Sequence, residues 1–76
     1  NNIVSANIRG SFNGWTGNTI VELDNGQIWQ QSIYSIITFI FIIYNPCVKI
    51  FYINGDYQME VEGTGIRISV KRIRIL

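Results

Sequence analysis

The chain has 76 residues and a formal net charge of +1, and it is 47% hydrophobic but only 14% charged. This length allows one small domain, and the scarcity of charge together with many β-branched residues favours sheet and argues against disorder. There is no histidine, so the commonest general base and the commonest metal ligand are both missing. We expect a single domain over residues 1–76, in which residues 1–7 could form a loosely ordered N-terminal segment.

The opening stretch NNIVSANIRG has neither the basic nor the apolar region of a signal peptide. We therefore expect either a cytoplasmic chain or one whose signal was removed before its first residue. Cys47 is the only cysteine, which excludes an intramolecular disulfide and favours a reducing compartment slightly. The compartment stays open, with the cytoplasm slightly favoured over an exported mature domain.

The next segments predict a short strand at NIRGSF and a glycine-rich loop at NGWTGN. Gly14 and Gly17 flank Trp15 and let the backbone turn tightly and approach the ring. We favour Trp15 as a plug over one end of the fold, because its large apolar area seeks burial. The alternative is a contact with a ligand or partner, made by Trp15, Trp29 and Gln31.

A hairpin is expected at NTIVELDNGQIWQQS, with Asn25-Gly26 in its turn. Two registers remain open. A two-residue loop pairs Leu23 with Ile28, whereas a three-residue loop with a bulge pairs Val21 with Trp29.

The run from Ile33 to Tyr44, IYSIITFIFIIY, is uncharged and mostly apolar. It is shorter than the roughly 18 residues of a membrane-spanning helix and rich in poor helix formers. We therefore predict no transmembrane segment but a long β-strand, closed by Pro46. Such a strand has two apolar faces, of which a barrel buries one. We expect the other face to be exposed and covered by another copy of the chain or another protein; its residues are Ile37, Phe39, Phe41 and Ile43.

The last third contains two further hairpin signals. Asn54-Gly55 is the preferred pair for a two-residue type I′ turn, and Gly63-Thr64 fits a type II′ turn. Both registers place apolar residues on one face and opposite charges on the other, such as Glu60 against Arg67. The parity of Ile73 breaks this pattern, which predicts a bulge or short turn just before it.

Short strands with frequent turn signals are typical of small barrels. We predict an all-β, SH3-like barrel of five to six antiparallel strands, with hairpin turns at Asn25-Gly26, Asn54-Gly55 and Gly63-Thr64.

Enzyme chemistry is not expected. Without histidine the usual serine or cysteine triads cannot form, and Cys47 is better explained as a half-buried structural thiol. The carboxylates have cross-strand cations or occupy turns, and no cluster has metal-ligand spacing. The sequence thus predicts no catalytic residues, no metal and no cofactor.

Two binding functions remain. We favour a protein-interaction or self-associating structural module. The alternative is a barrel that binds single-stranded nucleic acid through a basic C-terminal strand, although alternating charges also protect ordinary edge strands and the net charge is low. The residues of this alternative contact are Arg67, Lys71, Arg72 and Arg74.

The block GSFNGWTGNTIVELDNGQIWQQS resembles a recurrent signature of small bacterial domains of uncharacterised function. The signature reads G-x-F-x-G-W-x-G-x-T-x-F-x-L-D-N-G-Q-x-W-x-Q, and its later part is Y-x-M-x-V-x-G after a run of alternating tyrosines. Val21 replaces its second phenylalanine, and Ile and Phe replace most of the tyrosines. The resemblance covers nearly the whole chain from Gly10 onward and implies a fold but no activity.

Overall fold

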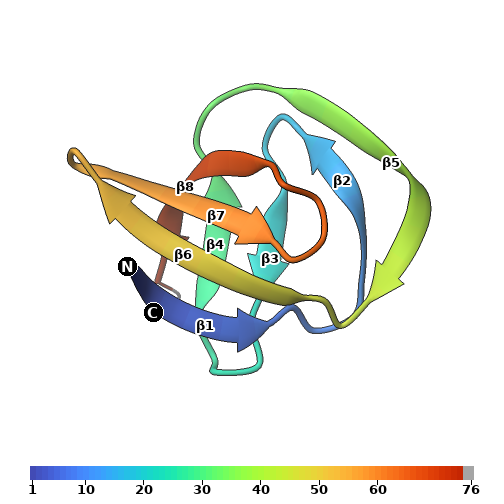
Figure 1. Cartoon of the computed structure of the whole chain (residues 1–76), viewed down its shortest axis with the longest axis horizontal. Coiled ribbons are helices and arrows are strands. Elements are labelled where there is room, and N and C mark those ends of the chain that lie inside the picture. Colours follow the sequence, from blue (N-terminus) through green and yellow to red (C-terminus); the bar gives the residue numbers. More distant parts are fainter. Residues whose placement is uncertain (75–76) are drawn as a thin grey trace.

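The computed structural model describes residues 1–74 and is built from antiparallel β-strands (Figure 1). In chain order the strands are β1 (Asn2–Asn7), β2 (Ser11–Thr16), β3 (Ile20–Glu22), β4 (Ile28–Gln31), β5 (Ile36–Tyr44), β6 (Cys47–Ile53), β7 (Asp56–Val61) and β8 (Arg67–Ile73). The predicted small all-β fold is confirmed, with eight strands in the described residues rather than five to six.

The strands form two sheets. Six of them pair in the order β1-β6-β7-β8-β4-β3, and β2 pairs with β5 alone. An isolated bridge between Ile8 and Leu23 brings the chain after β1 to the end of β3. There the backbone N–H of Arg9 donates to the carbonyl of Glu22 at 2.8 Å. The sheet therefore curls until its two edges meet at one corner, but the described strands do not close a continuous barrel.

The hairpin at Asn25-Gly26 takes the three-residue loop. Val21 lies opposite Trp29, and the N–H of Leu23 donates to the carbonyl of Gln27 at 2.8 Å. Gly26, with φ of 89°, supplies the left-handed residue that such a loop needs. This register places Val21 and Trp29 together on the buried face.

The β6–β7 turn has the predicted two-residue form, since Ile53 lies opposite Asp56 and both Asn54 and Gly55 have positive φ. The β7–β8 register also agrees, because Glu60 lies opposite Arg67.

The β7–β8 turn itself is longer than predicted. The N–H of Thr64 donates to the carbonyl of Val61 at 3.1 Å, so Glu62 and Gly63 occupy the centre of that turn. The predicted two-residue turn centred on Gly63 and Thr64 is wrong in this detail.

Strand β8 contains no bulge. Its first half pairs with β7 and its second half with β4, and Val70 is the partner of both Tyr57 and Gln31. The pairing from Gln31–Val70 to Ile28–Ile73 runs without a register shift. The irregularity predicted just before Ile73 is therefore wrong.

Strand β2 runs through the stretch that the sequence predicted as a loop. It pairs with β5 from Ser11 to Thr16, and its register shifts between Phe12 and Gly14. Gly14 has φ of 137°, and a β-carbon there would collide with the backbone of β5. The shift turns both Phe12 and Trp15 inward, although they differ in strand parity, and their rings meet edge to face at 5.1 Å.

The core lies between the six-stranded sheet and the β2–β5 pair. Its members are buried apolar side chains from strands of both sheets and from the links between them: Ala6, Ile8, Phe12, Trp15, Val21, Leu23, Trp29, Val48, Ile50, Met59, Val61, Ile68 and Val70. Residues Asn2–Asn7, at the start of the chain, belong to this architecture as strand β1 beside β6.

Candidate functional site: the outward face of strand β5

Strand β5 and the link before it expose large apolar side chains to water. Ile40 is 91% exposed and Phe41 70% exposed. The neighbouring apolar residues that are also more than half exposed are Ile33, Tyr34, Ile36, Ile42 and Tyr44. We call these seven residues the β5 face. Ile33 and Tyr34 lie in the link that leads into the strand. A concentration of exposed apolar side chains in one segment indicates an interaction site.

The inward side of β5 carries three of the four residues predicted to be the exposed stripe. Ile37 and Phe39 pack against the core, and Phe39 lies 6.0 Å from Phe12, measured between ring centroids. Ile43 is half-buried. The expectation that Ile37, Phe39 and Ile43 form an exposed stripe is therefore wrong, and only Phe41 of that set belongs to the β5 face.

The middle of β5 arches away from its partner strand. Phe12 pairs with Ile43 and Gly14 pairs with Thr38, so one residue of β2 stands against four of β5. The four residues, Phe39–Ile42, have no partner strand in the described part of the chain. Because the arch interrupts regular alternation, the adjacent side chains of Ile40 and Phe41 are both exposed.

A groove of about 400 Å³ lies beneath the arch. The side chains and backbone of β5 form one wall, and Gly63 and Thr64 of the β7–β8 turn form the other. The wall on the β5 side is almost wholly apolar, so the groove could receive an aromatic or aliphatic side chain.

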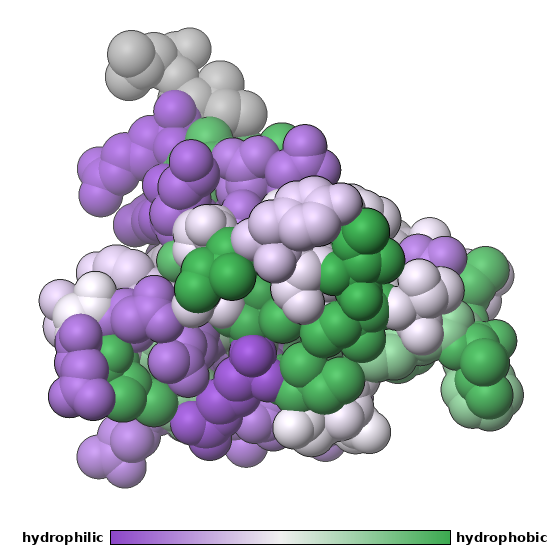
Figure 2. All heavy atoms as spheres, turned by 90° about the horizontal axis from the view of Figure 1, so that it is seen from above, coloured by the Kyte–Doolittle hydropathy of each residue, from purple (hydrophilic) through white to green (hydrophobic). Residues whose placement is uncertain are grey.

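No charged residue interrupts the chain from Ile33 to Tyr44. Natural edge strands usually carry charges or prolines that prevent pairing with another chain, and β5 lacks both between these positions. Figure 2, which views the molecule from above, shows hydrophobic side chains gathered at the centre and right, toward the side where Figure 1 places β5, and hydrophilic ones mainly at the left.

The three residues predicted as an alternative contact, Trp15, Trp29 and Gln31, lie in the interior. Trp15 is 1% exposed, as expected for a ring that seeks burial, and Trp29 and Gln31 are also buried. Gln31 accepts from the N–H of Gly17 and donates to the carbonyls of Ile33 and Ser35. None of the three offers a surface to a partner.

The predicted basic strip is divided between two sides of β8. Strand alternation puts Arg67 and Lys71 on the outer side and Arg72 on the opposite one. Arg67 is already engaged, because it pairs with Glu60 at 3.0 Å and lies 3.9 Å above the centre of the Phe51 ring. Arg74 is exposed just beyond the end of the strand. The four cations therefore do not form one continuous surface.

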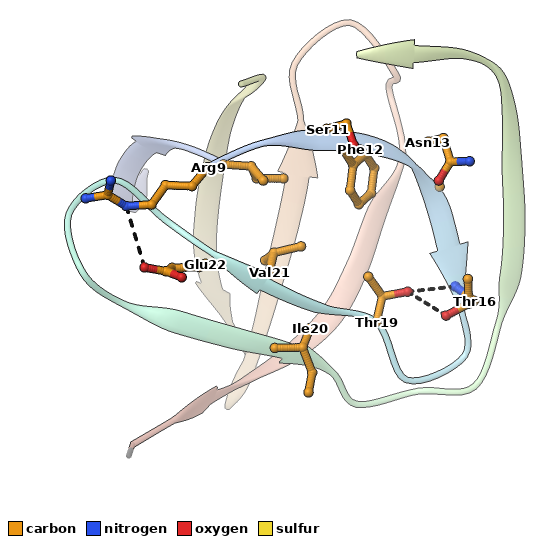
Figure 3. A pocket seen from close by; sticks show the side chains of 11 residues that line it. Arg9, Ser11, Phe12, Asn13, Thr16, Thr19, Ile20, Val21 and Glu22 are labelled. Atoms are coloured by element: carbon orange, nitrogen blue, oxygen red, sulfur yellow. Dashed lines mark hydrogen bonds and ion pairs between the residues drawn. The ribbon is translucent and has the colours of Figure 1, made fainter. Parts of the chain in front are cut away.

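A second hollow, of about 220 Å³, lies between β2 and β3 (Figure 3). Arg9 and Glu22 form an exposed ion pair of 3.6 Å at one end. At the other end the Thr19 hydroxyl accepts from the N–H of Thr16 at 2.8 Å. Since these polar groups already satisfy one another, the hollow leaves no free charge for a ligand to meet.

Within residues 1–74 no three His, Cys, Asp or Glu side chains come close enough to hold a metal ion. Cys47 is a free, half-buried thiol at the start of β6. Over the same residues no helix has the length and apolar character needed to cross a membrane.

Comparisons of the chain with protein-family models, with curated proteins and with solved structures find no match. The resemblance to the small bacterial domains therefore stays a prediction, and the candidate function depends on the surfaces described above.

Proposed function

We propose that this chain is a non-enzymatic structural module that self-associates through the β5 face. The observation that carries the proposal is the exposure of seven apolar residues between Ile33 and Tyr44 with no charge among them.

A second copy is the occupant that fits this surface best. The face has no charge to attract a charged partner, so a complementary surface must itself be apolar, and the β5 face meets that requirement. Two copies related by a two-fold axis bring the same face of each copy together, which is what an isologous interface needs. The unpaired arch gives each copy a segment that can contact the other.

Light scattering behind a sizing column, over a series of protein concentrations, tests the proposal. The native chain should show the mass of a dimer or larger defined assembly. Phe41→Lys should shift it to the monomer mass, because a lysine buried against an apolar partner loses its hydration. Ile3→Lys is the matched control: Ile3 is 55% exposed but lies on β1, and this variant should keep the native mass.

Circular dichroism in the far ultraviolet establishes that both variants retain the strand content of the native protein. A native chain that is monomeric at every concentration would overturn the proposal. So would a folded Phe41→Lys variant that assembles as well as the control.

A further inference from the structure

A second exposed surface lies on the β6–β7 hairpin, away from the β5 face. The tip of this hairpin projects beyond the other strands (Figure 1). Tyr52 and Tyr57 lie directly opposite each other across it. Tyr52 comes two residues after the buried Ile50 in β6, and Tyr57 comes two residues before the buried Met59 in β7, so both point to the side of the hairpin that faces the core. They lie beyond the last buried residues of that side and are therefore exposed. Tyr52 is 53% exposed and Tyr57 38% exposed.

The two tyrosine rings are held in place from beneath. Their centroids are 4.7 Å apart, and the Tyr57 ring meets the Trp29 ring edge to face at 5.4 Å. Trp29 is itself fixed, since it is buried and its Nε1–H donates to Oε1 of Gln27 at 3.1 Å. The exposed ring of Tyr57 therefore rests on the buried ring of Trp29, and the ring of Tyr52 packs against that of Tyr57. Because this packing already restricts the tyrosine side chains, they lose little rotamer freedom when a ligand binds.

The same side of the sheet carries a cation. Arg72 lies opposite Trp29 and two residues after Val70, which lies opposite Tyr57. Within residues 1–74 the ion pairs are Arg9–Glu22 and Arg67–Glu60, so the exposed Arg72 guanidinium is not neutralised by a carboxylate there.

The carboxylates of this hairpin point to the other side. Asp56 alternates with Tyr57 along β7 and accepts a hydrogen bond from the Ser69 hydroxyl at 2.7 Å. Glu60, on the same outer side, is paired with Arg67. The segregation leaves the tyrosine side with positive charge and stackable rings, and the outer side with the acidic groups.

We propose that Tyr52, Tyr57 and Arg72 form a binding site for single-stranded nucleic acid. A planar base stacks on the exposed tyrosine rings, as bases do on the aromatic platforms of single-strand-binding proteins. The guanidinium of Arg72 meets the phosphate that follows the base. The site shares Arg72 with the predicted basic strip, but Arg67 and Lys71 lie on the other side of the strand and take no part.

Fluorescence anisotropy with a labelled twelve-residue oligothymidylate, at several salt concentrations, tests the site. Tyr52→Ala should weaken binding by at least about fivefold, the lower end of what one stacked base contributes, and Tyr52→Phe should restore it. Log affinity falls as log salt rises, and Arg72→Gln should make this fall less steep by about 0.7, the value for one phosphate contact on a single strand.

Two matched variants and one matched probe separate this site from general attraction. Ile20→Ala removes an exposed apolar side chain of β3 that belongs neither to this site nor to the β5 face, and Lys71→Gln removes the neighbouring cation on the opposite side of β8; both should leave affinity and slope at native values. An abasic oligomer with the same number of phosphates should bind at least fivefold more weakly than the oligothymidylate.

The proposal is overturned if the native protein does not bind the oligothymidylate at low salt. It is also overturned if the abasic oligomer binds as tightly as the oligothymidylate. The same holds if Lys71→Gln and Arg72→Gln reduce the salt dependence of affinity by the same amount. Repeating the titration on the Phe41→Lys variant keeps the result independent of self-association, because Phe41 lies on β5 and not on the hairpin.

Discussion

The side-chain oxygen of Gln31 accepts a hydrogen bond from the backbone N–H of Gly17 at 2.9 Å, which fastens the β2–β3 turn to strand β4. The amide nitrogen of the same side chain donates to the carbonyls of Ile33 and Ser35 at 3.0 and 2.8 Å. One buried side chain therefore fixes both the turn before β3 and the link that leads into β5. The position of the β5 face therefore depends on this polar residue as well as on apolar packing.

Gln31→Ala should lower the free energy of unfolding by roughly 2–3 kcal/mol, since it removes three part-buried hydrogen bonds, to Gly17, Ile33 and Ser35, at about 1 kcal/mol each. Gln31→Glu should also destabilise the fold, because a carboxylate can still accept from Gly17 but cannot donate to Ile33 and Ser35. Urea unfolding followed by tryptophan fluorescence measures both changes.

The matched control is Gln30→Ala. Gln30 is half-exposed, and its side chain makes one hydrogen bond of 3.4 Å, to the carbonyl of Asn18. Its replacement should change the free energy of unfolding by no more than about 0.5 kcal/mol. Equal losses for Gln30→Ala and Gln31→Ala would show that Gln31 does not have the role described.

Gly14→Ala tests the close approach of β2 to β5. A β-carbon at Gly14 would collide with the carbonyl of Ile37 and lie 3.0 Å from the α-carbon of Thr38, which are rigid backbone atoms. The variant should therefore lose more stability than the ~1–2 kcal/mol that an unfavourable positive φ alone costs. Thermal or urea unfolding measures the loss.

Gly10→Ala is the comparison for Gly14. Gly10 also has a positive φ, of 90°, but a β-carbon there would meet nothing within 4 Å. Gly10→Ala should therefore lower the free energy of unfolding by only the ~1–2 kcal/mol that an unfavourable positive φ costs. A Gly14→Ala variant no less stable than Gly10→Ala would mean that β2 and β5 are not so closely apposed.

The sequence predicted the β6–β7–β8 meander well, because two independent signals agree there. The turn preference of Asn54-Gly55 sets one register, and the alternation of apolar and charged residues demands the same one. The resulting pairs, from Val48–Val61 to Ile53–Asp56, all occur in the structure. In the β3–β4 hairpin only the turn was predictable, since the apolar pattern fitted two registers.

The candidate site could be predicted only in part. The run from Ile33 to Tyr44 indicated an exposed apolar face, but both sides of the strand are apolar, so alternation could not tell which side is buried. That choice depends on Phe12 and Trp15 of the distant strand β2, which reach the core only through the register shift at Gly14. A glycine that reads as a loop signal in fact lies within a strand, beside a register shift, and nothing local distinguishes the two cases.

The assignment of the two sides of β5 leads to a direct comparison of neighbours. Phe39 packs against the core beside Phe12, whereas the adjacent Ile40 is almost fully exposed. Phe39→Ala should lower the free energy of unfolding by about 2 kcal/mol, less than the ~3–5 kcal/mol of a fully buried phenylalanine because the ring is only half-buried. Ile40→Ala should change it by about 0.5 kcal/mol or less.

Both variants should be made in the Phe41→Lys background, so that unfolding is not coupled to the dissociation of subunits, which would make stability depend on protein concentration. Urea unfolding at two concentrations verifies that condition. If Ile40→Ala then proved the more damaging change, β5 would be turned the other way, with Ile40 in the core and Phe39 on the surface. The self-association surface would in that event be the stripe of Ile37, Phe39, Phe41 and Ile43 that the sequence alone predicted.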